Sequence, residues 1–133
     1  MVRGVREERE LVRLLDRLGF AVVRSPASGS RTKLDRPDLL AGRRGLILAL
    51  EVKATGKEVL YLKRESVEQL IRFSDRFGAK PYVAVKFKGK GVGWLLVEAG
   101  SLEQTGKGFK LSLRVEGRFS EPRLHFQLSQ VSP

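Results

Sequence analysis

Four residues could act together on a phosphodiester bond: Glu8, Asp38, Glu51 and Lys53. Asp38 follows a proline, and 13 residues later Glu51 and Lys53 stand two positions apart, as in a Glu-x-Lys motif. Carboxylate oxygens bind hard divalent cations, and an ammonium group can orient the attacking water or stabilise charge on the phosphate. The residue types and their spacing therefore predict the site of a divalent-metal nuclease.

The apolar run Leu46–Leu50 ends directly in Glu51, Val52 and Lys53. A continuous apolar run of this length predicts a strand that is buried on both faces. Side chains alternate along a strand, so Glu51 and Lys53 are expected on one face and Val52 in the core. A carboxylate and an ammonium group would then lie side by side.

Asp38 begins a second short apolar segment, residues 39–41, which a turn at residues 42–45 would fold back as a hairpin partner. This pairing is expected to place Asp38 opposite Glu51.

Glu8 lies in a segment, residues 5–18, whose apolar side chains recur at helical spacing and which ends at Gly19. At about 100° per residue, Glu8 lies within about 30° of the centre of the apolar stripe, whereas Glu7 and Glu10 lie farther from it. A carboxylate on a core-facing stripe is costly unless it is paired or coordinates a metal. Glu8 is therefore expected to face inward as the third acid, and an ordinary salt bridge is the alternative.

The composition indicates a polyanionic partner, because the 133 residues carry a net charge of +11. Nucleic acid is the leading partner, since Lys and Arg bind phosphates. A membrane surface is the weaker alternative, because no basic amphipathic helix carries exposed aromatic residues on its other face. No signal peptide or membrane-spanning run is visible, so an intracellular protein without a membrane partner is expected.

The metal ion itself is predicted by elimination. The chain has no cysteine, which excludes thiolate sites, and its one histidine, His125, alternates with apolar residues as a surface side chain would. Oxygen ligands alone favour Mg²⁺, or Mn²⁺ in its place, over Zn²⁺.

The predicted element order is helix, three strands, helix and two strands, with further strands near the C-terminus. This order gives an α/β fold in which a mixed central sheet is flanked by helices, in one domain spanning residues 1–133. The predicted elements are a helix at about 64–77 and strands at 20–24, 82–87, 94–97, 110–115 and 124–128.

Two groups of residues are candidate phosphate contacts. The loop Ser25–Arg36 is rich in small, hydroxyl and charged residues, and it is either a solvated connection or an arm that grips the sugar-phosphate chain. The second group precedes the helix at 64–77, where ordinary surface charge is the alternative. The candidates are Ser28, Ser30, Arg31 and Lys33 in the loop, and Lys63 and Arg64 before the helix.

Phe73 lies off the apolar stripe formed by Val67, Leu70, Ile71, Ser74 and Phe77. An exposed phenylalanine suggests a partner surface, and a wider buried face is the alternative.

Several stretches resemble the archaeal Holliday-junction resolvases, a family of the PD-(D/E)xK nuclease superfamily that also contains many restriction endonucleases. The stretches are ERELVRLL, GFAVVRSPASGS, PDLLAG, LEVKAT and LYLKRESVEQLIRF, and RFGAKPYVAVKF and VGWLLVE extend the match to residue 98. The resemblance implies a restriction-endonuclease-like core at about 5–98, whereas residues 101–133 match only loosely. It also implies catalytic roles for Glu8, Asp38, Glu51 and Lys53, and substrate contacts by Arg9, Arg24 and the loop serines.

Together these features predict a structure-selective endonuclease that resolves four-way DNA junctions. Asp38, Glu51 and the Val52 carbonyl are expected to hold Mg²⁺, Glu8 to bind its water or a second ion, and Lys53 to orient the water. A junction needs two symmetric cuts and one chain has one site, so a two-fold homodimer with Phe73 at its interface is expected. The alternatives are a related nuclease for other branched or damaged DNA and a non-catalytic junction-binding module, which gives no reason for three converging acids.

Overall fold

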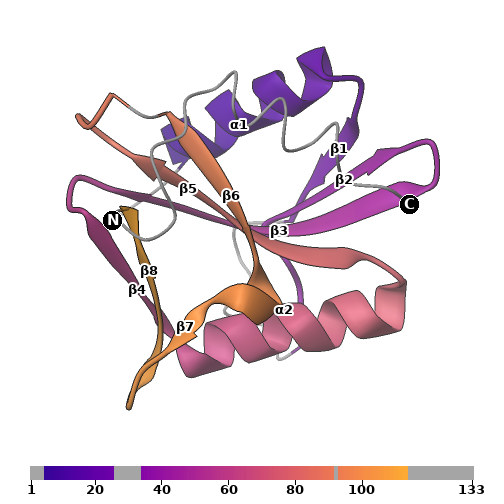
Figure 1. The fold of residues 1–133 in the computed structure, drawn as a ribbon. Coiled ribbons are helices and arrows are strands. Elements are labelled where there is room, and N and C mark those ends of the chain that lie inside the picture. The colour runs from indigo at the N-terminus through magenta and orange to yellow at the C-terminus, as the bar shows by residue number, and fades with distance from the viewer. Residues whose placement is uncertain (1–4, 26–33, 92, 114–133) are drawn as a thin grey trace.

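The computed structural model describes residues 5–25, 34–91 and 93–113, which form two helices and two β-sheets (Figure 1). The elements, in chain order, are α1 (Val5–Arg17), β1 (Ala21–Arg24), β2 (Leu39–Arg43), β3 (Leu46–Thr55), β4 (Val59–Lys63), α2 (Arg64–Phe77), β5 (Lys80–Phe87), β6 (Trp94–Glu98), a 3₁₀ helix (Ala99–Ser101), β7 (Glu103–Gln104) and β8 (Gly108–Ser112).

The larger sheet has five strands in the order β1-β2-β3-β5-β6. β3 and β5 run parallel, and every other pair in this sheet is antiparallel. The parallel pair is joined by β4 and α2, and β4 belongs to a second, three-stranded sheet in the order β4-β8-β7. The predicted mixed sheet with flanking helices is therefore confirmed, with a small second sheet added beside α2.

The two helices cover opposite faces of the large sheet, with α1 above it and α2 below it in Figure 1. Side chains of β3 point alternately to the two faces of the sheet, so some contact the α1 side and others the α2 side. Leu48, Leu50 and Val52 pack in one buried cluster with α1, whereas Ala49 packs in a second cluster with α2. β3 is thus buried on both faces, as its apolar run predicts, and its position is set by packing from both sides.

The tip of the β2–β3 hairpin is a two-residue turn with positive φ at Arg44 (50°) and Gly45 (86°). Positive φ at both central residues suits the twist of a tight hairpin. Next to the turn, Arg43 Nη1 donates to the Leu18 carbonyl at 2.8 Å, and its guanidinium lies 4.5 Å from the centre of the Phe20 ring. The hairpin therefore caps the C-terminal end of α1 and fixes the helix against the sheet.

The sequence predictions of individual elements differ from the structure in two respects, and one further prediction is not tested. The strands β4 and β7 were not predicted, and the strand expected at 110–115 is observed at 108–112. The expected strand at 124–128, with His125, lies outside the described residues. The helices and the strands at 20–24, 39–41, 46–53, 82–87 and 94–97 are confirmed, with ends that differ by at most two residues.

The roles of the two aromatic residues of α2 are partly reversed. Phe77, predicted on the buried stripe, is 51% exposed, whereas Phe73 is partly buried against the second core cluster. Helical side chains lean toward the N-terminus, so the Phe77 ring covers Phe73 from the following turn, with ring centres 5.1 Å apart. Phe77 lies in the last turn of α2, and no further turn covers it.

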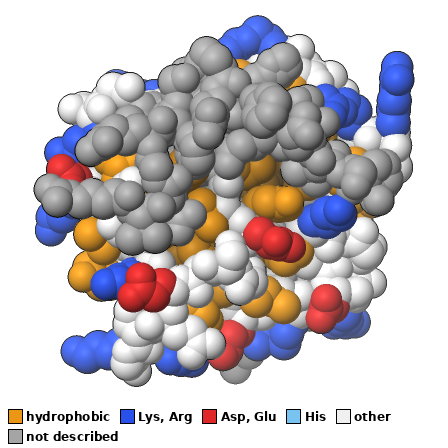
Figure 2. Space-filling model, in the orientation of Figure 1, with side chains coloured by type: hydrophobic (Ala, Val, Ile, Leu, Met, Phe, Trp, Pro, Cys, Tyr) orange, Lys and Arg blue, Asp and Glu red, His pale blue; other side chains and the backbone are white. Residues whose placement is uncertain are grey.

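No helix among the described residues is long and apolar enough to cross a membrane. On the face drawn in Figure 2, Lys and Arg side chains lie mainly around the rim, and Asp and Glu side chains lie among them.

Candidate active site

The acidic and basic side chains of β3 lie on one face of the strand. Lys53 Nζ is 3.5 Å from Glu51 Oε2, and these side chains are 34% and 13% exposed, respectively. Val52, between them, is buried in the core beneath α1. The predicted alternation is confirmed, and it leaves a nearly buried carboxylate beside an ammonium group that still reaches solvent.

Asp38 lies one residue before β2 and is fixed on β3 by two hydrogen bonds. Its backbone N–H donates to the Leu50 carbonyl at 2.9 Å, and its Oδ2 accepts from the Val52 N–H at 2.8 Å. Because Leu39 pairs with Leu50, Asp38 lies opposite Glu51. The predicted placement across two paired strands is confirmed.

The electrostatics of Asp38 and Glu51 indicate a crowded acidic site. Burial raises the pKa of Glu51 to about 7, the charge of Asp38 adds to this rise, and Lys53 partly offsets it. Burial also raises the pKa of Asp38, and the Val52 N–H opposes that rise. The charge of Glu8 raises the pKa of both carboxyls. The charges of Glu8 on α1 and of Asp38 before β2 therefore both disfavour ionisation of Glu51 on β3.

Glu8 points inward, as its helical phase predicts, and it is also ion-paired. Arg24 Nε, at the end of β1, donates to Glu8 Oε1 at 2.8 Å, and the Glu8 side chain is only 20% exposed. The pair ties the first turns of α1 to the end of β1. Arg24, expected from the family resemblance to contact substrate, thus lies at the edge of the acidic site.

Glu10 has a structural role that its position off the apolar stripe did not predict. Lys86 Nζ of β5 donates to both Glu10 oxygens at 2.7 and 2.6 Å, and Trp94 Nε1 of β6 donates to Oε2 at 3.3 Å. These contacts hold the same part of α1 that carries Glu8. Helical phase could not find them, because the partners lie on strands far along the chain.

The chemistry of the donors fits a hard divalent cation. Magnesium is commonly held by one or two carboxylates and keeps several waters. Asp38 and Glu51 supply two adjacent carboxylates, and a cation would relieve their mutual repulsion. Within residues 5–25, 34–91 and 93–113, no group of three or more acidic, His or Cys side chains is arranged to hold a metal ion. The fit is therefore that of a hydrated ion held by the Asp38–Glu51 pair.

The other predicted contact residues lie in varied surroundings. Arg9 and Lys63 are exposed. Arg64 is partly buried: its Nη2 donates to the Thr105 carbonyl at 3.2 Å, and its guanidinium lies 5.5 Å from the centre of the Phe109 ring. Arg64 therefore holds α2 to the second sheet. The loop candidates Ser28, Ser30, Arg31 and Lys33 lie outside the described residues.

Comparisons with known proteins agree with this geometry. The sequence model of the family described as archaeal Holliday junction resolvase (Hjc) matches residues 1–121. The chain belongs to this family. Among curated Hjc-family relatives, the crossover junction endodeoxyribonuclease Hjc of Methanocaldococcus jannaschii is 40% identical over 114 residues, covering 86% of this chain and 79% of the relative. That of Archaeoglobus fulgidus is also 40% identical, over 109 residues, covering 82% and 78%.

A solved structure supports the same assignment. The structure of Archaeoglobus fulgidus Hjc, described as a Holliday junction resolvase from an archaeal hyperthermophile, matches with a TM-score of 0.81 and 36% identity. The match covers 91% of this chain and 98% of that one. The mixed sheet with two flanking helices is thus the restriction-endonuclease-like fold of Hjc, as the family resemblance implied.

Proposed function

We propose that this Hjc-family protein is an endonuclease that resolves four-way DNA junctions by metal-dependent hydrolysis. The observation that carries the proposal is the adjacent, nearly buried acid pair Asp38 and Glu51 with Lys53 beside it, in a chain of this family. Burying several carboxylates together is unfavourable unless a cation offsets their charge. A purely structural role would not require this arrangement.

Each side chain has a separate task in this proposal. Asp38 and Glu51, with the Val52 carbonyl, would hold Mg²⁺ or Mn²⁺, which when bound acts as a Lewis acid on the phosphate and acidifies water. The Val52 N–H fixes the direction of the Asp38 carboxylate. Lys53 extends toward solvent from the same face, where it can donate to a phosphate oxygen and stabilise developing negative charge. Glu8 approaches the site from α1, and its charge raises the pKa of both acids.

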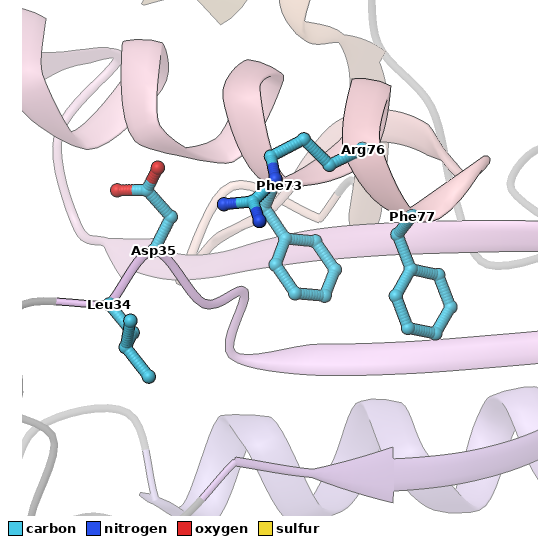
Figure 3. A pocket seen from close by; sticks show the side chains of 5 residues that line it. All are labelled: Leu34, Asp35, Phe73, Arg76 and Phe77. Carbon is cyan, nitrogen blue, oxygen red and sulfur yellow. The ribbon is translucent and has the colours of Figure 1, made fainter.

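A homodimer completes the proposal, because two strands must be cut and the described part of each chain holds one such site. Closed dimers use the same surface patch on both subunits. The aromatic pair Phe73 and Phe77 on α2 is the surface we assign to this contact, since Phe77 is half exposed beside a groove of about 350 Å³ (Figure 3). The predicted DNA contacts remain Arg9, Arg24 and Lys63, with Ser28, Ser30, Arg31 and Lys33 in the loop, whereas Arg64, also predicted, contacts the second sheet.

The decisive experiment compares the acid variants on two substrates. Asp38→Asn and Glu51→Gln should each lower Mg²⁺-dependent nicking of a synthetic four-way junction by more than about a hundredfold, because each removes a metal-binding oxygen. Junction binding in a gel-shift assay should persist, since the basic surface is unchanged. Glu103→Gln, at an exposed acid on β7, is the matched control and should cleave as the wild type does.

The wild type itself distinguishes the alternatives. Junctions cut in preference to linear duplex indicate a resolvase, equal cutting of both indicates a general nuclease, and binding without cutting indicates an inert junction binder. Undiminished cleavage by both acid variants would remove the assigned site.

A further inference from the structure

Asp38 is carried by a segment that has no regular secondary structure. Residues 35–37 belong to no helix or strand, and β2 begins only at Leu39. The C-terminal end of this segment is bound to the residue that follows β1, because Ser25 Oγ donates to the Pro37 carbonyl and the Ser25 N–H donates to the Asp38 carbonyl at 2.9 Å. Asp38 itself is bonded to β3 through Leu50 and Val52, and the residues before it determine how the chain approaches that position.

The preceding residues are held by α2. Gln69 Oε1 accepts from the Arg36 N–H at 2.8 Å. One helical turn later, Arg72 donates through Nε and Nη2 to the two oxygens of Asp35 at 3.0 and 3.1 Å. Both contacts join residues distant in sequence, and they bind successive residues of the segment that leads to Asp38.

The Arg72–Asp35 contact fixes orientation as well as distance. Two parallel N–H···O bonds between a guanidinium and a carboxylate define a plane, which a lysine could not do. The hydrogen bond from Arg72 lowers the pKa of Asp35 and keeps it ionised. The Arg72 side chain is 48% exposed, and exposed ion pairs add little to overall stability. The effect of this pair is therefore mainly on position.

Asp35 also forms one wall of the groove beside the aromatic pair. Figure 3 shows its carboxylate directed toward α2, while the Phe73 and Phe77 rings project from the helix on the other side. The lead-in to Asp38 is thus held against the helix at this groove.

We propose that Arg72, assisted by Gln69, is a positioning residue for Asp38: α2 holds residues 35 and 36, and so sets where the Asp38 carboxylate meets the Val52 N–H and Glu51. The consequence for metal binding rests on the proposed function. Residues that orient metal ligands commonly change metal affinity 10- to 100-fold when replaced. Loss of the Arg72 guanidinium should therefore weaken the metal site without changing its ligands.

The first test needs neither metal nor DNA. The Val52 N–H donates to Asp38 Oδ2, so its hydrogen exchange, followed by NMR in the metal-free protein, reports how firmly Asp38 is held. Arg72→Ala should accelerate Val52 exchange by about tenfold while core amides such as that of Leu48 keep their wild-type rates. Glu65→Gln is the matched control, because it removes the negative charge of the more exposed partner of Arg72, at 2.8 Å, and leaves the Asp35 contact in place.

The second test is Mn²⁺ binding by calorimetry. Arg72→Ala should raise the dissociation constant for Mn²⁺ about 10- to 100-fold. The Mn²⁺ dissociation constant of Arg72→Lys should be close to that of Arg72→Ala if the two-bond geometry matters, and close to that of the wild type if only charge matters. The double variant Asp35→Ala/Arg72→Ala should lose no more Mn²⁺ affinity than either single variant, since both changes break the same contact.

These outcomes separate the two proposals. The positioning role is overturned if Arg72→Ala keeps the wild-type Val52 exchange rate and Mn²⁺ affinity, or if Arg72→Lys does. It is also overturned if Glu65→Gln changes both quantities as much as Arg72→Ala, or if exchange accelerates equally at all amides. If the wild type fails to cut junctions while Arg72→Ala still loosens the Val52 amide, the proposed function fails and the positioning role stands.

Discussion

The Glu51 carboxyl is nearly buried between Asp38 and Lys53, and its pKa is raised from 4.5 to about 7. Between these two values the folded protein binds more protons than the unfolded chain. The free energy of unfolding therefore falls as pH rises from about 4.5 to about 7, and burial of Asp38 acts in the same direction. This is the reverse of the usual behaviour of acids that are salt-bridged in the folded state.

We predict that Glu51→Gln removes much of this dependence. A shift from 4.5 to about 7 corresponds to at most about 3–4 kcal/mol, at about 1.4 kcal/mol per pH unit. Urea denaturation of metal-free protein at pH 5 and pH 8 should show the wild type losing up to this amount relative to Glu51→Gln. Glu103→Gln should follow the wild type. Parallel curves for wild type and Glu51→Gln would show that Glu51 titrates normally.

The residues of the site differ in how far the sequence could predict them. Glu51, Lys53 and Val52 follow from strand alternation, and Glu8 follows from helical phase, because both depend only on local period. The partners of these side chains do not. Arg24 pairs with Glu8 from 16 residues away, and Lys86 pairs with Glu10 from 76 residues away. Such contacts depend on which strands become neighbours, which a single sequence does not specify.

At the scale of elements, β8 passes very close to β4. A Cβ atom at Gly108 would lie 2.3 Å from the Leu62 carbonyl oxygen and 3.0 Å from the Arg64 nitrogen. Both contacts are with backbone, which cannot move aside cheaply. Gly108 therefore permits the approach of the two strands, and Arg64 in turn ties α2 to this sheet.

Gly108→Ala should destabilise the protein by about 1–3 kcal/mol, the usual cost of inserting atoms into a packed contact. Gly106→Ala is the matched control, because no atom of the described residues lies within 4 Å of its Cβ position, and it should stay within about 0.5 kcal/mol of wild type. Urea denaturation midpoints measure both. Equal midpoints for the two variants would mean that β8 can move away from β4.

The second sheet shows why some elements were not predicted. β4 is five residues long, and its burial does not alternate cleanly between apolar and polar positions. It runs directly into α2, and its partner β8 follows much later in the chain. Short strands of this kind are defined by their partners, whereas β3 and the two helices are long enough for their own pattern to identify them.

At the scale of the whole molecule, folding gathers part of the net charge of +11 on one element. Arg6, Arg9, Arg13 and Arg17 recur at helical spacing along α1 and are all exposed. No long basic run marks this surface in the sequence, since acidic and apolar residues separate the arginines. The helix brings them to its outward side.

The assembly prediction also belongs to this scale. If the aromatic pair of α2 forms a two-fold interface, Phe77→Asp should place a charge in a desolvated contact and give monomers in light scattering. Phe73→Asp should do the same and also lower the free energy of unfolding, because Phe73 packs on the core. Tyr61→Asp, at a 70% exposed aromatic on β4, is the control and should leave the mass unchanged.

Two results would contradict the assigned interface. A wild type that is monomeric at micromolar concentration would contradict the homodimer. A Phe77→Asp variant that stays dimeric would show that the interface does not include Phe77.

Trp94 is the single tryptophan of the chain, and its buried indole donates to Glu10 of α1. The protein therefore carries an intrinsic optical probe at the joint between α1 and the sheet. While the helix is docked, the indole is shielded from water and its fluorescence should be blue-shifted. Detachment of α1 would expose the ring and shift the emission to the red. The same helix brings Glu8 to the acidic site, so the wavelength of maximum emission reports whether the site is assembled.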